Sequence, residues 1–247
     1  MEHFDSFANL YKENYFFKKT GKNHEFNTRL EIVLELTKNC SGRLLDCACG
    51  SGEITAEVLA SGQYKAAILV DISESMLALA EEKIGGIKLA TDVYYVHSDV
   101  FDYKPDSQEK FDLILCLGLV AHTGELSLLL TQLKSMLSRN GKIILQSSLL
   151  DHVGIKFTKL LMSMVHRKHK AYDIEFYSAK DIEYSSQAAG LSIKTVMRYN
   201  FGIPFGDKVS KVANYWVEVL MRRFASKYGS DAVYVIINDV GNPSAAK

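Results

Sequence analysis

The stretch LLDCACGSG, residues 44–52, puts one acid and two glycines directly after an apolar run and before a helix-like segment. Gly50 and Gly52 have no Cβ, so the backbone there can approach a ligand closely. In an open parallel sheet flanked by helices, ligands bind at the carboxyl ends of the strands, where this turn falls. The stretch therefore predicts a binding turn at the end of the first strand of such a sheet.

A second acid supports this interpretation. Asp71 ends the next apolar run, 19 residues after Gly52. A carboxylate about 20 residues beyond such a turn is well placed to accept hydrogen bonds from the hydroxyls of a ribose. The turn and the acid together predict a ligand that contains a nucleoside.

Short apolar runs alternate with amphipathic segments from residue 43 onward, a pattern typical of parallel strands joined by helices. The expected strands are Arg43–Ala48, Ala66–Asp71, Val93–Ser98, Phe111–Leu117, Lys142–Ser147, Leu191–Tyr199 and Ala232–Asn238. The expected helices are Asn27–Thr37, Glu53–Ala60, Ser75–Ile84, Glu125–Leu137, Ile155–His166, Ala179–Ala189 and a stretch from Asp207 to about Tyr228. Asn140 and Gly141 are expected to end one helix and turn the chain into the fifth strand.

Two cofactor classes use this geometry, dinucleotides and S-adenosylmethionine. A dinucleotide turn carries a third glycine or alanine three residues after the second glycine, and Thr55 stands there instead. Asp46, at the mouth of the first strand, would repel a pyrophosphate but suits a ligand with an ammonium and a sulfonium group. Charge therefore favours the sulfonium cofactor.

The run 44–52 resembles the first motif of class I S-adenosylmethionine-dependent methyltransferases, a hydrophobic strand followed by an acid and Gly-x-Gly. Residues 71–77, 97–100, 111–116 and 140–145 resemble later motifs of that family, in the family's order. The resemblance covers about residues 40–150. It implies an α/β, Rossmann-like sheet of seven strands in the order 3-2-1-4-5-7-6, with the last strand antiparallel, helices on both faces and helical lid insertions.

The resemblance also implies roles for individual residues. Asp46 would contact the methionine amino group, with the turn that holds Cys47, Ala48, Gly50 and Gly52 around it. Asp71 would bind the ribose. The remaining cofactor residues would be Ile72 and Met76 beside the adenine, Asp99 and Val100 at its edge, and Leu117 and Gly118 on the floor.

His122 follows the fourth strand, where a substrate would sit, and is the candidate general base; a helix-start histidine bonded to backbone is the competing interpretation. Ala121 stands where the family often has an acid, a departure from its pattern. Tyr11 and Tyr15 lie in an aromatic-rich amino-terminal arm, which in this family often folds over the cofactor as a lid. Arg29 either pairs with the cofactor carboxylate or lies on a solvated helix face.

Other features leave two interpretations each. Cys47 and Cys49 have no second cysteine pair and no histidine at ligand spacing, so no metal is expected. The apolar stripe that ends in the basic run 166–170 suits a lid helix, an acidic substrate or a membrane surface. The segment from 207 to 228 would line a substrate pocket or form a dimer interface.

The 247 residues suit a single methyltransferase domain, 1–247, with an amino-terminal helical lid (1–42), a cofactor-binding core (43–148) and two helical substrate covers (149–190 and 200–231). Lys plus Arg and Asp plus Glu both number 29, which disfavours a nucleic-acid substrate. No apolar run is long enough to span a membrane, and no secretory signal is expected. The four cysteines suggest a reducing, cytoplasmic setting rather than a disulfide framework.

The sequence therefore predicts transfer of a methyl group from S-adenosylmethionine to an oxygen, nitrogen or carbon of a small-molecule acceptor, by a monomer or homodimer. Two other classes stay open. One is an NAD(P)-dependent oxidoreductase, and the other is a module that binds the cofactor without transferring its methyl group. The sequence does not identify the acceptor.

Overall fold

The computed structural model describes residues 24–106, 109–151, 175–201, 220 and 223–239. Seven strands form one sheet in the order β3-β2-β1-β4-β5-β7-β6. The first five strands pair in parallel, and β7 pairs antiparallel with both β5 and β6. The expected fold class, strand order and antiparallel last strand are confirmed.

Most strands and helices match the bounds expected from the sequence within about three residues; β5 begins five residues earlier than expected, and the short helix α5 was not expected. The strands are β1 Ser41–Cys47, β2 Gln63–Asp71, β3 Asp92–His97, β4 Phe111–Leu117, β5 Leu137–Ser148, β6 Leu191–Tyr199 and β7 Asp231–Asn238. The helices are α2 His24–Thr37, α3 Glu53–Ser61, α4 Glu74–Gly85, α5 Val120–Thr123, α6 Leu126–Met136 and α8 Ala179–Ala188. The expected helix at 155–166 and most of the one at 207–228 lie outside the described residues.

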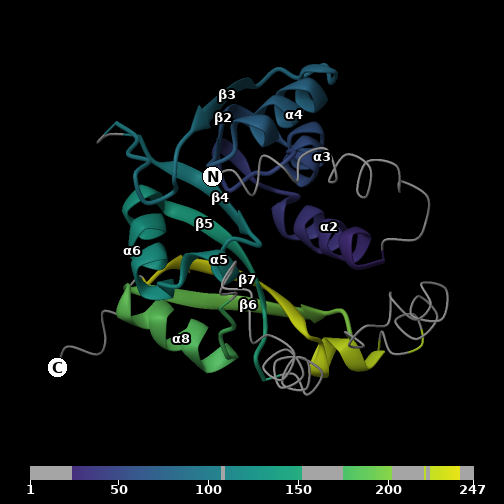
Figure 1. Ribbon diagram of the computed structural model, residues 1–247, viewed down its shortest axis with the longest axis vertical. Coiled ribbons are helices and arrows are strands. Elements are labelled where there is room, and N and C mark those ends of the chain that lie inside the picture. The colour runs from purple at the N-terminus through teal and green to yellow at the C-terminus, as the bar shows by residue number, and fades with distance from the viewer. Residues whose placement is uncertain (1–23, 107–108, 152–174, 202–219, 221–222, 240–247) are drawn as a thin grey trace, which may run out of the picture.

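Helices cover both faces of the sheet (Figure 1). Apolar residues of α2, α3 and α4 form one core with one face of the strands, and those of α5, α6 and α8 form a second core with the other face. In α6, Leu126, Leu129, Leu130 and Leu133 recur at helical spacing and are all buried. The two cores hold the carboxyl ends of the parallel strands in one row.

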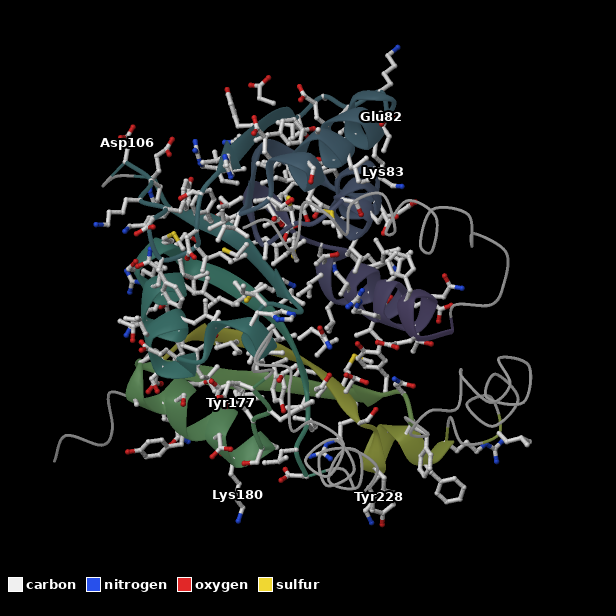
Figure 2. All side chains as sticks on the ribbon, viewed as in Figure 1. Glu82, Lys83, Asp106, Tyr177, Lys180 and Tyr228 are labelled. Carbon is white, nitrogen blue, oxygen red and sulfur yellow. The ribbon has the colours of Figure 1, made fainter. Side chains whose placement is uncertain are left out.

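Local sequence signals fix several helix ends. Ser73 caps α4 by accepting a hydrogen bond from the Met76 amide. Ser178 and Asp181 form a capping box at the start of α8. Figure 2 shows Lys180 extending from α8 away from the sheet, so the helix turns its polar side outward and its apolar side, with Ile182, inward.

The expected turn at Asn140 and Gly141 needs a correction, because both residues lie inside the bounds of β5. Leu137 pairs with Phe111, and the next pair is Lys142 with Leu113, so residues 138–141 bulge out of the ladder. A Cβ on Gly141 would lie 2.7 Å from the Phe111 carbonyl oxygen. The glycine therefore permits a bulge where the sequence predicted a separate turn.

None of the helices within the described ranges is long and apolar enough to cross a membrane.

Candidate cofactor and active site

A cavity of about 610 Å³ opens at the carboxyl ends of β1, β2, β3 and β4, and α2 closes one side of it. This volume lies in the range typical of small-molecule sites. The residues expected from the sequence that line it are Asp46, Ala48, Gly50, Asp71, Ile72, Met76, Asp99, Val100, Leu117, Gly118 and His122. Cys47 and Gly52 lie behind this lining, and Tyr11 and Tyr15 lie outside the described residues.

Asp71 ties the glycine turn to the end of β2. One carboxylate oxygen accepts a hydrogen bond from the Gly50 amide at 2.7 Å, and the other accepts one from the Ser73 amide at 2.9 Å. Burial raises the pKa of Asp71. The amide hydrogen bonds and the nearby His97 favour the charged carboxylate and so reduce this rise. A carboxylate oxygen has two lone pairs, so each can still accept a hydrogen bond from a ligand hydroxyl.

Asp46 is buried at the tip of β1, with 4 % of its surface exposed, and still borders the cavity. The Thr55 hydroxyl, in the first turn of α3, donates a hydrogen bond to Asp46 Oδ2. Burial raises the pKa of Asp46 to about 7; the bond from Thr55 opposes the rise and the charge of Asp71 adds to it. Near neutral pH this carboxyl is therefore about half protonated in the free protein, and a cationic ligand would favour its charged form.

The turn between Asp46 and α3 places three alternate small residues in unusual backbone conformations. Ala48, Gly50 and Gly52 all have positive φ, at 63°, 54° and 69°. A Cβ on Gly50 would meet no atom within 4 Å, so the missing side chain leaves open space on the cavity side. A Cβ on Gly52 would lie 2.8 Å from the Ala80 Cβ, so this glycine serves the packing of α3 against α4.

The far end of the cavity is lined by Ile72 and Met76 from the start of α4 and by Asp99 and Val100 after β3. Asp99 Oδ1 accepts a hydrogen bond from the Phe101 amide at 2.9 Å, which fixes the carboxylate at the start of its turn. Apolar side chains beside one acid suit a flat heterocycle with an amino group at its edge.

His122 lies on the short helix α5, directly after β4, and its imidazole is exposed. Partial burial lowers the pKa of His122 below its usual 6.5, so the neutral imidazole, which can accept a proton, predominates near pH 7. His97, by contrast, does not line the cavity, and its Nε2 lies 3.0 Å from the Ile72 carbonyl oxygen.

Two residues of α2 also line the cavity, far from the glycine turn in sequence. Arg29 is the only lysine or arginine among the described lining residues, and its guanidinium lies 5.8 Å from the centre of the Phe26 ring. Its Nε is buried and has no hydrogen-bond partner. The sequence offered Arg29 as one of two interpretations and gave no signal for Phe26, because only the packing of α2 brings them there.

Within the described ranges, no group of three or more histidine, cysteine or acidic side chains could hold a metal ion. All four cysteines are unbridged.

Residues 44–141 match a family model described as a methyltransferase domain. This region is therefore similar to a methyltransferase domain, and it lies in a sheet whose strand order is the one that the resemblance implied. This region contains the cavity walls contributed by β1, β2, β3 and β4.

Two curated relatives are C-methyltransferases of ubiquinone and menaquinone biosynthesis. The one from Saccharophagus degradans is 29 % identical over 155 residues, 61 % of this chain and 55 % of the relative. The one from Yersinia pestis is 28 % identical over 147 residues, 57 % of this chain and 55 % of the relative. The matched region thus spans about half the length of these relatives.

Two solved structures share the fold of the methyltransferase domain. Magnesium protoporphyrin IX methyltransferase from Synechocystis, solved with S-adenosylhomocysteine, superposes with a TM-score of 0.64 at 16 % identity, over 96 % of this chain and 94 % of that one. Mycolic acid cyclopropane synthase, also solved with S-adenosylhomocysteine, gives a TM-score of 0.62 at 13 % identity, over 85 % of this chain and 83 % of that one.

Proposed function

We propose that this protein transfers a methyl group from S-adenosylmethionine to a small-molecule acceptor, at an oxygen, nitrogen or carbon atom. The observation that carries the proposal is the arrangement of Asp46, Asp71 and Asp99 at three strand ends around the open turn at Gly50. Three acids around a cavity suit a ligand with an ammonium, a sulfonium and a ribose, and disfavour a pyrophosphate.

The residues present fit this cofactor along its whole length. Asp71 would accept hydrogen bonds from the ribose hydroxyls, and Asp46 would hold the ammonium group. Arg29 would pair with the carboxylate, since its Nε has an unused donor and no other lysine or arginine lines the described cavity. Ile72 and Met76 would flank the adenine, and Asp99 with Val100 would bind its amino edge.

Leu117 and Gly118 would form the floor beneath the methionine part. The turn that holds Ala48 and Gly50 would supply close backbone contact, with Cys47 and Gly52 supporting it from behind. In the proposed domain plan, residues 1–42 with Tyr11 and Tyr15 form a lid, and residues 149–190 and 200–231 cover the acceptor.

S-adenosylmethionine supplies a methyl group that its sulfonium already makes electrophilic. The chain's own task is then chiefly to hold the acceptor atom in line with that methyl group and to exclude water. For a hydroxyl acceptor, His122 would remove the proton at its neutral imidazole. Since both curated relatives are C-methyltransferases, carbon is the first acceptor atom to test.

Calorimetry with S-adenosylmethionine and with NAD tests the cofactor. We expect saturable one-to-one binding of the methyl donor and no binding of NAD. Tight binding of NAD alone would instead support an NAD(P)-dependent oxidoreductase and overturn the proposal.

Binding alone does not distinguish an enzyme from a module that only holds the cofactor. Release of S-adenosylhomocysteine in the presence of a metabolite panel does, and we expect it to depend on the panel. The proposal places this reaction in the cytoplasm, where the four unbridged cysteines would stay reduced, and in a monomer or homodimer.

A further inference from the structure

Gln146 lies near the carboxyl end of β5, beside β4, and has no part in the proposed cofactor binding or in proton removal. Its side chain is 4 % exposed, and its Oε1 has no hydrogen-bond partner in the described structure. A buried amide oxygen without a partner is uncommon, because burial removes the water that would otherwise donate to it. No group among the described residues donates to this oxygen, so it is open to a donor from a ligand.

Gly118 connects Gln146 to the cavity. This glycine lines the cavity at the end of β4, and its φ is 83°. A Cβ built on Gly118 would have a single neighbour within 4 Å, Gln146 Oε1 at 3.8 Å. The space beside Gly118 is thus open, and the Gln146 oxygen borders it.

Tyr199, at the end of β6, supports Gln146 from the other side. Its side chain is 2 % exposed, its hydroxyl has no well-formed hydrogen bond, and the Gln146 amide adjoins it. Arg29 from α2 acts on the same hydroxyl through its charge. Tyr199 at the end of β6 and Gly118 after β4 therefore both adjoin the Gln146 side chain.

One other buried polar group at this edge, Asp231, already has partners. Asp231 accepts hydrogen bonds from Ser148 at 2.5 Å, from Asn200 at 3.0 Å and from Ser230 at 2.9 Å. This cluster holds the ends of β5, β6 and β7 together. The donors of this cluster are used within it, whereas Gln146 Oε1 accepts from no group among the described residues.

We propose that Gln146 is a specificity-determining residue for the acceptor, and that the acceptor carries a hydroxyl or N–H group that donates a hydrogen bond to Gln146 Oε1 across the space beside Gly118. This inference rests on the proposed methyl transfer and names its substrate class. A site built to pair with a donor rejects an analogue that lacks the donor, because the buried oxygen then stays unpaired.

The test uses matched ring probes on the full chain loaded with S-adenosylhomocysteine. Phenol and aniline carry the donor, and anisole has a similar ring without it. Binding is followed by saturation-transfer NMR. In the wild type, we expect phenol or aniline to bind at least about tenfold more tightly than anisole.

Gln146→Leu keeps the side-chain volume and removes the oxygen. We expect it to reduce the preference for phenol or aniline over anisole to less than about threefold, since the variant lacks the oxygen that would accept from the donor. Tyr199→Phe, which removes the adjoining hydroxyl, should reduce this binding preference by less than Gln146→Leu does. Gln132→Leu is the matched control, because its amide bonds the Tyr103 carbonyl away from the cavity, and it should leave the preference unchanged.

Equal binding of phenol and anisole by the wild type would overturn the inference, and so would an unchanged preference in Gln146→Leu. Failure of both phenol and aniline to give a saturable signal would also count against it. Calorimetry with S-adenosylmethionine on Gln146→Leu separates this outcome from failure of the proposed function. We expect the cofactor affinity of that variant to stay within about threefold of wild type.

Discussion

The two halves of the sheet edge treat their buried polar groups differently. On the β1–β2 side, Asp71 and Asp46 are held by groups close in the chain, the amides of Gly50 and Ser73 and the hydroxyl of Thr55. On the β5–β7 side, partners come from segments up to 83 residues apart, as in the bond between Ser148 and Asp231. The contacts of the first half therefore join segments at most 21 residues apart, whereas the second half depends on distant segments that the sheet brings together.

The two sides of the sheet edge also differ in the function proposed for them, cofactor binding on one side and acceptor selection on the other. The β1–β2 side falls within the matched methyltransferase region, residues 44–141, and Gln146, Tyr199 and Asp231 fall outside it. In the proposed function the first side binds the common cofactor and the second selects the acceptor. The predictions below test this division from the largest expected effect to the smallest.

The largest effect is expected at His122, which lies between the two halves on α5. His122→Ala should reduce turnover by about 10²–10⁴-fold if the imidazole is the general base, with little change in cofactor affinity. Because burial lowers the pKa of His122, wild-type turnover should begin to fall only at a lower pH than an ordinary histidine would give. Steady-state kinetics at saturating cofactor measure both. Wild-type rates in the variant would leave His122 a structural role only.

Asp71→Ala should weaken S-adenosylmethionine binding by about 100-fold, because it removes both the proposed ribose contact and the anchor of the Gly50 amide. Calorimetry gives the dissociation constant. Asp71→Asn is the control, since its amide oxygen can still accept one of the two backbone hydrogen bonds. This variant should lose less affinity for S-adenosylmethionine than Asp71→Ala. An unchanged dissociation constant in Asp71→Ala would break the assignment of this half to the cofactor.

Asp46→Asn should weaken cofactor binding by about tenfold at pH 8, where the wild-type carboxyl is charged, and much less at pH 6. The pKa of Asp46 is raised, so its charge destabilises the fold progressively as pH rises from about 4 to about 7. The variant should therefore raise Tm in the free protein, and by more at pH 8 than at pH 5. Calorimetric titration and thermal unfolding at these pH values check the two signs. If the difference in Tm between wild type and Asp46→Asn did not change with pH, the raised pKa of Asp46 would be wrong.

The smallest effect concerns the backbone of the glycine turn. Ala48 has φ 63°, which costs a residue with Cβ about 1–2 kcal/mol, while glycine loses about 0.5–1 kcal/mol through chain entropy. Ala48→Gly should thus stabilise the protein by up to about 1 kcal/mol, or roughly 2–4 °C in Tm. Gly50→Ala is the matched reversal at φ 54°, and it should lower Tm and also weaken cofactor binding, since its methyl group would enter the open space. Equal Tm shifts of the same sign would show that φ does not govern this turn.

The local pattern of apolar and polar residues predicted most of the strands and helices. The bounds of β4 and β6 match the expected strands residue for residue, since apolar runs bounded by polar segments mark them clearly. The sequence did not predict the bulge in β5, because Asn140 and Gly141 suit a turn and a bulge equally. Thr55 was noted as a departure from the dinucleotide pattern, but its bond to Asp46 depends on how α3 packs over β1.

By itself, the sequence determined the alternation of parallel strands with helices and the row of acids after the strands, because periodic apolar runs and glycine turns act over short stretches of chain. The strand order followed only from the resemblance to a known family. The tertiary structure alone decided which distant side chains meet: Arg29 and Phe26 reach the cavity through α2, and Gln146 meets Tyr199 across the β5–β7–β6 edge. It also set the pKa of Asp46, since burial is a property of the packed chain rather than of any one segment.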